Sequence, residues 1–316
     1  MHPLVEAETM MRLIRDADGL SPPSAADVRV VRVSLVLQSL ASTDTGRRMT
    51  LVPAYRRLHR ADDDGLLQVF LDRDGVTRGH AILALMEEVA DAQVRADPLR
   101  LIDLALHTGG DRAWLIALSG GVGQGRSIAR HLSDNALSSH ADVTFIKRIN
   151  GKTMLKTASR PPIGPFARPA PLELGATPRF REYRLSEDRI RLFGHYAAIM
   201  AAGGDGDQTL ASASETFAAA FALRQFAFDE RREPRAFLSW AMLDRKAVTR
   251  LEAFGIAGLR PCDWRCGTTP CLIEVIGDER HTEPMLKQWH RSFRSENPAR
   301  LLVDPGTAQA RVVNAG

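Results

Sequence analysis

The sequence predicts an α+β fold made of two tandem domains, each a mostly antiparallel sheet with flanking helices. Two observations lead to this prediction. A pattern of elements in the first half recurs in the second at an offset of 157 residues, from Arg78 to Arg235. Between the halves, residues 159–180 carry repeated prolines and no apolar periodicity, which is typical of an extended linker. We therefore expect domains at 1–158 and 181–316.

The elements follow the same order in both halves. Helical sequence leads to a hairpin with a charged turn, then to a polar helical stretch, a buried strand, an amphipathic helix and a final strand pair. In the first half we expect strands at 67–71, 80–85, 113–118, 143–148 and 153–156, with a helix at 126–135. In the second half we expect strands at 225–228, 237–243, 271–276, 301–304 and 310–313, with a helix at 283–293. Ser186 is predicted to cap an earlier helix that contains Tyr196 at an apolar position.

The composition is that of a globular protein with a substantial core. Of the 316 residues, 44% are hydrophobic and 25% are charged, which excludes disordered and fibrous classes. The net charge of +4 lacks the clustered basic footprint of a nucleic-acid-binding protein. No apolar run reaches the roughly 20 residues of a membrane span. The first residues lack the basic and apolar regions of a secretory signal, so we expect a cytoplasmic location.

Several motifs of the second half resemble a known family. Ser239-Trp240-Ala241 and Val303-Asp304-Pro305 are the most specific of them. They are similar to motifs of the toxin-activating lysine acyltransferases, the hemolysin-activating family that acts on RTX protoxins. The resemblance implies two N-acetyltransferase-like domains. It also implies a cytoplasmic enzyme that moves a fatty acyl group from acyl carrier protein to lysines of a pore-forming protoxin.

The resemblance also implies a catalytic His near the end of the first helix and a catalytic Asp on the central strand. The Asp position falls on Glu274 in the second half and on Ala117 in the first. The His position falls near 205–207 and 43–45, and neither segment contains a His. His195 lies about eleven residues earlier, roughly 16 Å along a helix, so it is not a simple substitute.

Glu274 is the candidate catalytic residue. A lysine amine has a pKa near 10.4, so its attack on a thioester near pH 7 needs a base. A Glu can serve if burial raises its pKa, and the flanking Ile273, Val275 and Ile276 favour burial. The alternative is a Glu at a strand edge that faces water or pairs with an Arg.

A glycine-rich loop at 119–127 is the candidate binding site for the phosphate of the acyl donor. It lies between a predicted strand and a predicted helix, where backbone N–H groups can hold a phosphate. The candidate contacts are Gly120, Gly121, Gly123, Gly125 and Arg126. A nucleotide-hydrolysing P-loop would need Lys where Arg126 stands. A flexible turn without ligand is a further alternative.

Three clustered cysteines, Cys262, Cys266 and Cys271, have His281 nearby, but their spacing is not that of a usual zinc site, so we expect no metal. The expected function is acyl transfer to a lysine of a protein acceptor such as an RTX-type protoxin. Acyl carrier protein or coenzyme A would be the donor, with no bound cofactor. The alternative is a catalytically inactive protein that uses the same fold to hold an acyl carrier or a toxin segment.

Overall fold

The computed structural model describes residues 25–71, 77–97, 109–120, 125–134, 136–149, 152–159, 183–203, 206–229, 233–293, 300–302 and 312–314. They form two compact units. Unit 2 contains Val31–Ser39 and the described residues of Arg56–Glu187. Unit 1 contains the described residues of Asp188–Gly316 together with two segments from the first half of the chain, the described part of Met1–Val30 and Leu40–Tyr55. The predicted linker lies outside the described residues apart from Ser159, so the predicted domain limits stay predictions.

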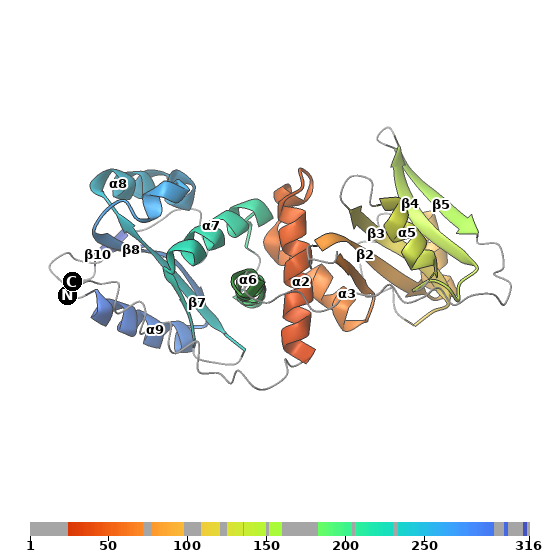
Figure 1. The fold of residues 1–316 in the computed structure, drawn as a ribbon, viewed down its shortest axis with the longest axis horizontal. Helices are drawn as coiled ribbons and strands as arrows, with labels where there is room; N and C mark the ends of the chain where they lie inside the picture. Colours follow the sequence, from red (N-terminus) through yellow and green to blue (C-terminus); the bar gives the residue numbers. More distant parts are fainter. Residues whose placement is uncertain are drawn as a thin grey trace. The chain divides into compact units, whose positions relative to one another are not determined.

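The sheet of unit 2 has five strands in the order β1-β2-β3-β4-β5. Neighbouring strands run antiparallel except β3 and β4, which are parallel. The strands are β1 (Leu67–Leu71), β2 (Thr77–Met86), β3 (Arg112–Gly120), β4 (Asp142–Ile149) and β5 (Lys152–Ser159). The helices of the first half are α2 (Ala25–Ala41), α3 (Leu51–Asp63), α4 (Glu88–Ala96) and α5 (Gly125–Asp134) (Figure 1).

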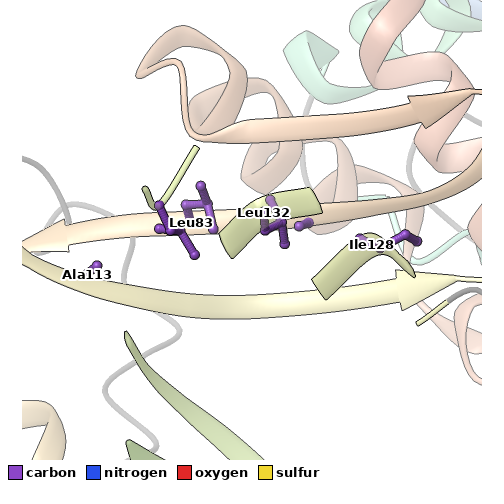
Figure 2. Close-up of a cluster of buried hydrophobic side chains, with 6 residues drawn as sticks. Leu83, Ala113, Ile128 and Leu132 are labelled. Atoms are coloured by element: carbon purple, nitrogen blue, oxygen red, sulfur yellow. The ribbon is translucent and has the colours of Figure 1, made fainter. Parts of the chain in front are cut away.

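Helix α5 closes one face of this sheet. Ile128 and Leu132 are four residues apart, so they share a face of the helix and both pack on the sheet. Figure 2 shows them beside Leu83 of β2 and Ala113 of β3. A second cluster, around the fully buried Trp114, packs against α4.

The sheet of unit 1 also has five strands, in the order β10-β9-β8-β7-β6, with β8 and β9 parallel and the other pairs antiparallel. The strands are β6 (Phe226–Phe228), β7 (Ala236–Leu243), β8 (Thr269–Gly277), β9 (Arg300–Leu302) and β10 (Val312–Asn314). The helices are α6 (Tyr183–Gly203), α7 (Leu210–Leu223), α8 (Arg245–Phe254) and α9 (Glu279–Ser292). Thr209 caps α7 and Asp244 caps α8, since each side chain accepts a hydrogen bond from the first turn.

The two faces of β7 and β8 bury different side chains. On one face, Leu238, Trp240 and Leu272 pack with Trp289 of α9. On the other face, Phe237 contacts Tyr196 of α6, with ring centroids 5.0 Å apart. Phe217 of α7 extends this second cluster. Alternation along the strands therefore sends one set of residues to α9 and the other to α6 and α7.

The central hairpins of the two units have the same register. Leu83 pairs with Leu115 and Ile82 with Ala117, which leaves Ile116 as a one-residue bulge in β3. At an offset of 157 residues, Trp240 pairs with Leu272 and Ser239 with Glu274, which leaves Ile273 as a bulge in β8. Each central strand therefore carries its bulge at the same point of the hairpin.

The predicted α+β class is confirmed, and the strands lie near their predicted positions. Two helix starts were wrong. Helix α6 begins at Tyr183, so Ser186 is not its N-cap, because the residues before Ser186 are also good helix formers. Helix α9 begins at Glu279, because Pro284 does not end the helix in its first turns. The assignment of both halves as N-acetyltransferase-like domains stays a prediction. Among the described residues, no helix is long and apolar enough to cross a membrane.

Candidate functional site

The bulge at Ile273 sets the direction of the Glu274 side chain. Glu274 pairs with Ser239 on the neighbouring strand, and paired residues of an antiparallel sheet share a face. If the strand alternated regularly from Leu272, which lies on the face covered by α9, Glu274 would point to that same face. The carboxylate instead lies on the α6 side of the sheet and is 9% exposed. A buried carboxylate in this position requires hydrogen-bond donors.

Three side chains supply those donors. The Tyr196 hydroxyl of α6 lies 3.0 Å from Glu274 Oε1, and the Ser239 hydroxyl lies 3.3 Å from Oε2. The Gln208 side chain also hydrogen-bonds to Glu274. The site therefore brings together residues from α6, the loop before α7, β7 and β8.

Tyr196 can satisfy Glu274 in both of its protonation states. The Tyr196 hydroxyl also lies 3.2 Å from Gln208 Oε1, but it has a single proton to donate. When Glu274 is ionised, the hydroxyl donates to the carboxylate. When Glu274 is protonated, the carboxyl group can donate to Tyr196, and Tyr196 can donate to Gln208. The arrangement therefore tolerates gain and loss of a proton without leaving a donor unpaired.

Burial shifts the pKa of Glu274 toward neutrality. Removal of the carboxylate from water raises its pKa to about 7, and the hydrogen bonds from Tyr196, Ser239 and Gln208 oppose the shift. The same burial, with the charge of Glu274, raises the pKa of Tyr196 well above its usual range. Glu274 is therefore the group of this site that exchanges a proton near neutral pH, while Tyr196 stays protonated.

A segment from the first half of the chain holds the loop that carries Gln208. The backbone N–H of Leu51 donates to the Gln208 carbonyl at 3.0 Å, and the N–H of Leu210 donates to the Met49 carbonyl at 2.7 Å. Between these bonds, Thr50 and Thr209 form an antiparallel bridge. Gln208 is thus fixed on both sides by backbone contacts before its side chain reaches Glu274.

Residues 205–207, where the resemblance implies a catalytic His, contain no His. Asp205 lies outside the described residues, and Asp207 is exposed. The next residue, Gln208, is the one that reaches Glu274. His195 is buried on α6, with its ring 6.4 Å from that of Phe228.

Sequence reasoning identified Glu274 and missed its three partners. Tyr196 was recognised as an apolar helix position and Ser239 as part of a family motif, but neither was linked to Glu274. The hairpin register could have linked Ser239 to Glu274. Gln208 gave no signal, because its place depends on pairing with a segment about 160 residues earlier.

The glycine-rich loop lies largely outside the described residues, including Gly121 and Gly123. Gly120 ends β3, where it pairs with Gly79, and Gly125 begins α5. Arg126 is the second residue of α5. The structure therefore supports the strand–loop–helix context of the predicted phosphate site and leaves its contacts as a prediction.

The matching turn in unit 1 is unsuited to an anion. Gly277, with a φ of 124°, ends β8, and α9 begins two residues later at Glu279. A side chain at Gly277 would collide with the Arg235 carbonyl. Asp278 and Glu279 place negative charge at the start of α9, where it would repel a phosphate.

The three cysteines differ in burial. Cys271 is fully buried near the start of β8, while Cys262 and Cys266 are exposed. The Cys266 sulfur accepts a hydrogen bond from the Asp244 N–H at 3.2 Å. Within the part of the chain that the structure describes, no three His, Cys, Asp or Glu side chains come together as a metal site.

Unit 1 is thus an α+β unit with a buried carboxylate on its bulged central strand. Residues 186–315 match the model of the RTX toxin acyltransferase family. The matched segment contains all four residues of the Glu274 site. The match supports a toxin-activating acyltransferase in general and a protein toxin as acceptor. A search of curated proteins found no match to the chain.

Proposed function

We propose that this protein is a protein-lysine acyltransferase that uses Glu274 as its general base. The acyl donor would be a thioester of acyl carrier protein or coenzyme A, and the acceptor a lysine of an RTX-type protoxin. The family match of residues 186–315 supports the reaction class. The observation that carries the proposal is the burial of the Glu274 carboxylate on the central strand, hydrogen-bonded to Tyr196 and Ser239, which raises its pKa to about 7. A base with a pKa near the working pH is the most effective one.

The proposed step conserves atoms and charge. The lysine nitrogen attacks the thioester carbonyl, and its acidity rises as the new C–N bond forms. Glu274 takes the proton from that nitrogen. The C–S bond then breaks, the thiolate leaves, and the proton held by Glu274 returns to the thiolate directly or through water. The products are an acylated lysine and a free thiol, and Glu274 ends ionised as it began.

Tyr196, Ser239 and Gln208 are positioning residues in this proposal. Their hydrogen bonds hold the carboxylate in one orientation and stabilise its ionised form, which keeps its pKa from rising further. The ability of Tyr196 to turn its proton toward Glu274 or Gln208 would accompany each transfer.

We also propose that the first half of the chain is a diverged copy of the second. The common register and the common bulge of the two central hairpins support this proposal. The copy has Ala117 where the second half has Glu274, so it would not carry the base. Its glycine-rich loop, including Gly120 and Gly125, would instead contact the phosphate of the donor.

The test measures the intact mass of a candidate toxin acceptor after incubation with a long-chain acyl thioester of acyl carrier protein. We expect a mass gain of one acyl group with the wild type and none with Glu274→Gln, which keeps the size and polarity of the side chain. Glu279→Gln is the control, because Glu279 is exposed on α9. Equal transfer by wild type and Glu274→Gln would reject Glu274 as the base.

One observation favours the alternative of an inactive binding protein. Both carboxylate oxygens of Glu274 already receive hydrogen bonds, as they would in a structural buried acid. Under that alternative the wild type would bind the acyl carrier but transfer no acyl group to any lysine acceptor. Isothermal titration with the acyl carrier, run beside the mass measurement, separates the two functions.

A further inference from the structure

Two buried polar groups of unit 2 have nitrogens without a hydrogen-bond partner. His80 of β2 is 4% exposed, and its Nδ1 has no partner among the described residues. The Nε of Arg57, on α3, also has none in that part of the chain. Buried donors without partners are rare, because each costs about as much as a lost hydrogen bond.

The Arg57 guanidinium is also half-buried, and nothing in the described residues offsets the cost of removing its charge from water. Burial lowers its pKa, and no described carboxylate acts in the opposite direction. The pKa of His80 is lowered to about 4, mainly by burial and to a smaller extent by the charge of Arg57. His80 is therefore neutral at pH 7, and Arg57 lies near enough for its positive charge to act on His80.

The neighbouring strand adds a hydroxyl to the same face. Ala81 packs in the cluster beneath α5, so the preceding residue, His80, points to the opposite face of the sheet. Ser119 of β3 pairs with His80 and shares that face. A guanidinium, an imidazole and a hydroxyl thus come from α3, β2 and β3.

We propose that Arg57, His80 and Ser119 form a binding site for a phosphate group in unit 2. Donors from three elements suit a tetrahedral anion with several oxygens, whereas Arg57 alone could occupy both oxygens of a carboxylate. A bound phosphate would accept from Arg57 Nε and His80 Nδ1 and would neutralise the Arg57 charge. The site uses none of the glycines of the 119–127 loop and does not depend on the proposed acyl transfer.

Unit 1 offers natural replacements for two of these residues. Arg57 is the seventh residue of α3, and the seventh residue of α7 is the buried Thr216. His80 follows the Gly79–Gly120 pair, and Phe237 follows the Ala236–Gly277 pair. Arg57→Thr and His80→Phe therefore remove the donors with side chains that this architecture accommodates.

The experiment is a titration of the full-length protein, labelled with ¹³C and ¹⁵N in its histidines, with inorganic phosphate, glycerol 3-phosphate and acetate. The His80 signals are those that His80→Phe removes. We expect either phosphate compound to shift them and Arg57→Thr to weaken binding about tenfold or more. Arg56→Thr, at the adjacent exposed arginine, should leave the affinity unchanged.

Comparison of the three compounds shows which kind of anion the site prefers. Tighter binding of glycerol 3-phosphate would assign the site to phosphate esters, and tighter binding of inorganic phosphate would assign it to the free ion. Equal binding of acetate would overturn the assignment to phosphate. Unmoved His80 signals at millimolar phosphate would overturn the site itself. Because this last result is read on the wild type, it holds even if a variant fails to fold.

Discussion

The Tyr196 hydroxyl lies 3.0 Å from Glu274 Oε1, although the two residues are 78 positions apart in the chain. The pair joins α6 to the central strand of unit 1. It combines a carboxyl group whose pKa is near 7 with a hydroxyl whose pKa is far above its usual range. The pair therefore holds one exchangeable proton near neutral pH, and that proton belongs to Glu274.

Tyr196→Phe should move the pH dependence of acyl transfer to higher pH. The variant loses a donor that stabilises ionised Glu274, so the pKa of Glu274 should rise above 7 by about one unit. The rise of kcat/KM with pH, followed between pH 5.5 and 9, should shift by the same amount. A profile that falls in height without moving along the pH axis would show that Tyr196 does not act through Glu274.

Glu274→Gln should stabilise the protein at alkaline pH. In the folded protein Glu274 keeps its proton up to about pH 7, whereas in the unfolded chain it loses the proton near pH 4.5. The free energy of unfolding of the wild type should therefore fall as the pH rises between these values. The variant has no such loss, so at pH 8 it should be more stable by about 1 to 3 kcal/mol.

Urea unfolding at pH 5 and pH 8 measures this difference. At pH 5 wild type and Glu274→Gln should have similar free energies of unfolding, and at pH 8 the variant should exceed the wild type. Glu279→Gln should show no pH-dependent gain, because its carboxylate is exposed. A constant difference between wild type and Glu274→Gln at both pH values would contradict the raised pKa.

The local elements of the fold could be predicted from the sequence because their signals are local. Alternation identified β1 and β6, continuous apolar runs identified β2 and β7, and the amphipathic pattern identified α5. The start of α6 was misplaced because Ser186, an acceptable cap, stands inside a helix that favourable residues extend by three positions. Such competition between cap and propensity is decided by the whole helix rather than by one residue.

Glu274, the strand residue of the site, could be predicted from the sequence, but its hydrogen-bond partners could not. Glu274 could be found because the Asp position of the resembling family falls on it, and its flanking apolar residues then indicated burial and a raised pKa. Gln208 could not be found, because its position depends on the bridge between Thr50 and Thr209. Contacts between segments so far apart follow from tertiary packing, on which local periodicity has no bearing.

Leu51→Pro should reduce activity through the loop that carries Gln208. Leu51 is the first residue of α3, where proline is compatible with the helix, so the main loss is the N–H that donates to the Gln208 carbonyl. We expect a several-fold lower kcat with little change in KM for the acyl donor. Leu51→Val is the control, since it keeps the N–H and most of the buried side chain. Equal activity of the two variants would show that this hydrogen bond does not position Gln208.

Asp91→Asn should destabilise unit 2 without affecting the Glu274 site. The Asp91 carboxylate is 1% exposed and receives hydrogen bonds from Arg95, Arg112 and Trp114 at 2.8 to 2.9 Å. Burial alone would raise its pKa, but these donors lower the pKa below its usual value. The ionised form therefore stabilises the fold above the unfolded pKa near 3.9, and this contribution is lost as the pH falls through the folded pKa.

The variant should unfold with a free energy lower by about 3 kcal/mol at pH 7, because two arginines lose their shared partner. The difference between wild type and Asp91→Asn should shrink as the pH falls below about 3.9, because the carboxylate then gains a proton in the unfolded wild-type chain, while the lowered pKa keeps it ionised longer in the folded protein. Thermal unfolding from pH 7 to pH 3 follows this convergence. The opposite trend, with a difference that grows on acidification, would mean that Asp91 is buried in its protonated form and that its three donors do not hold a charge.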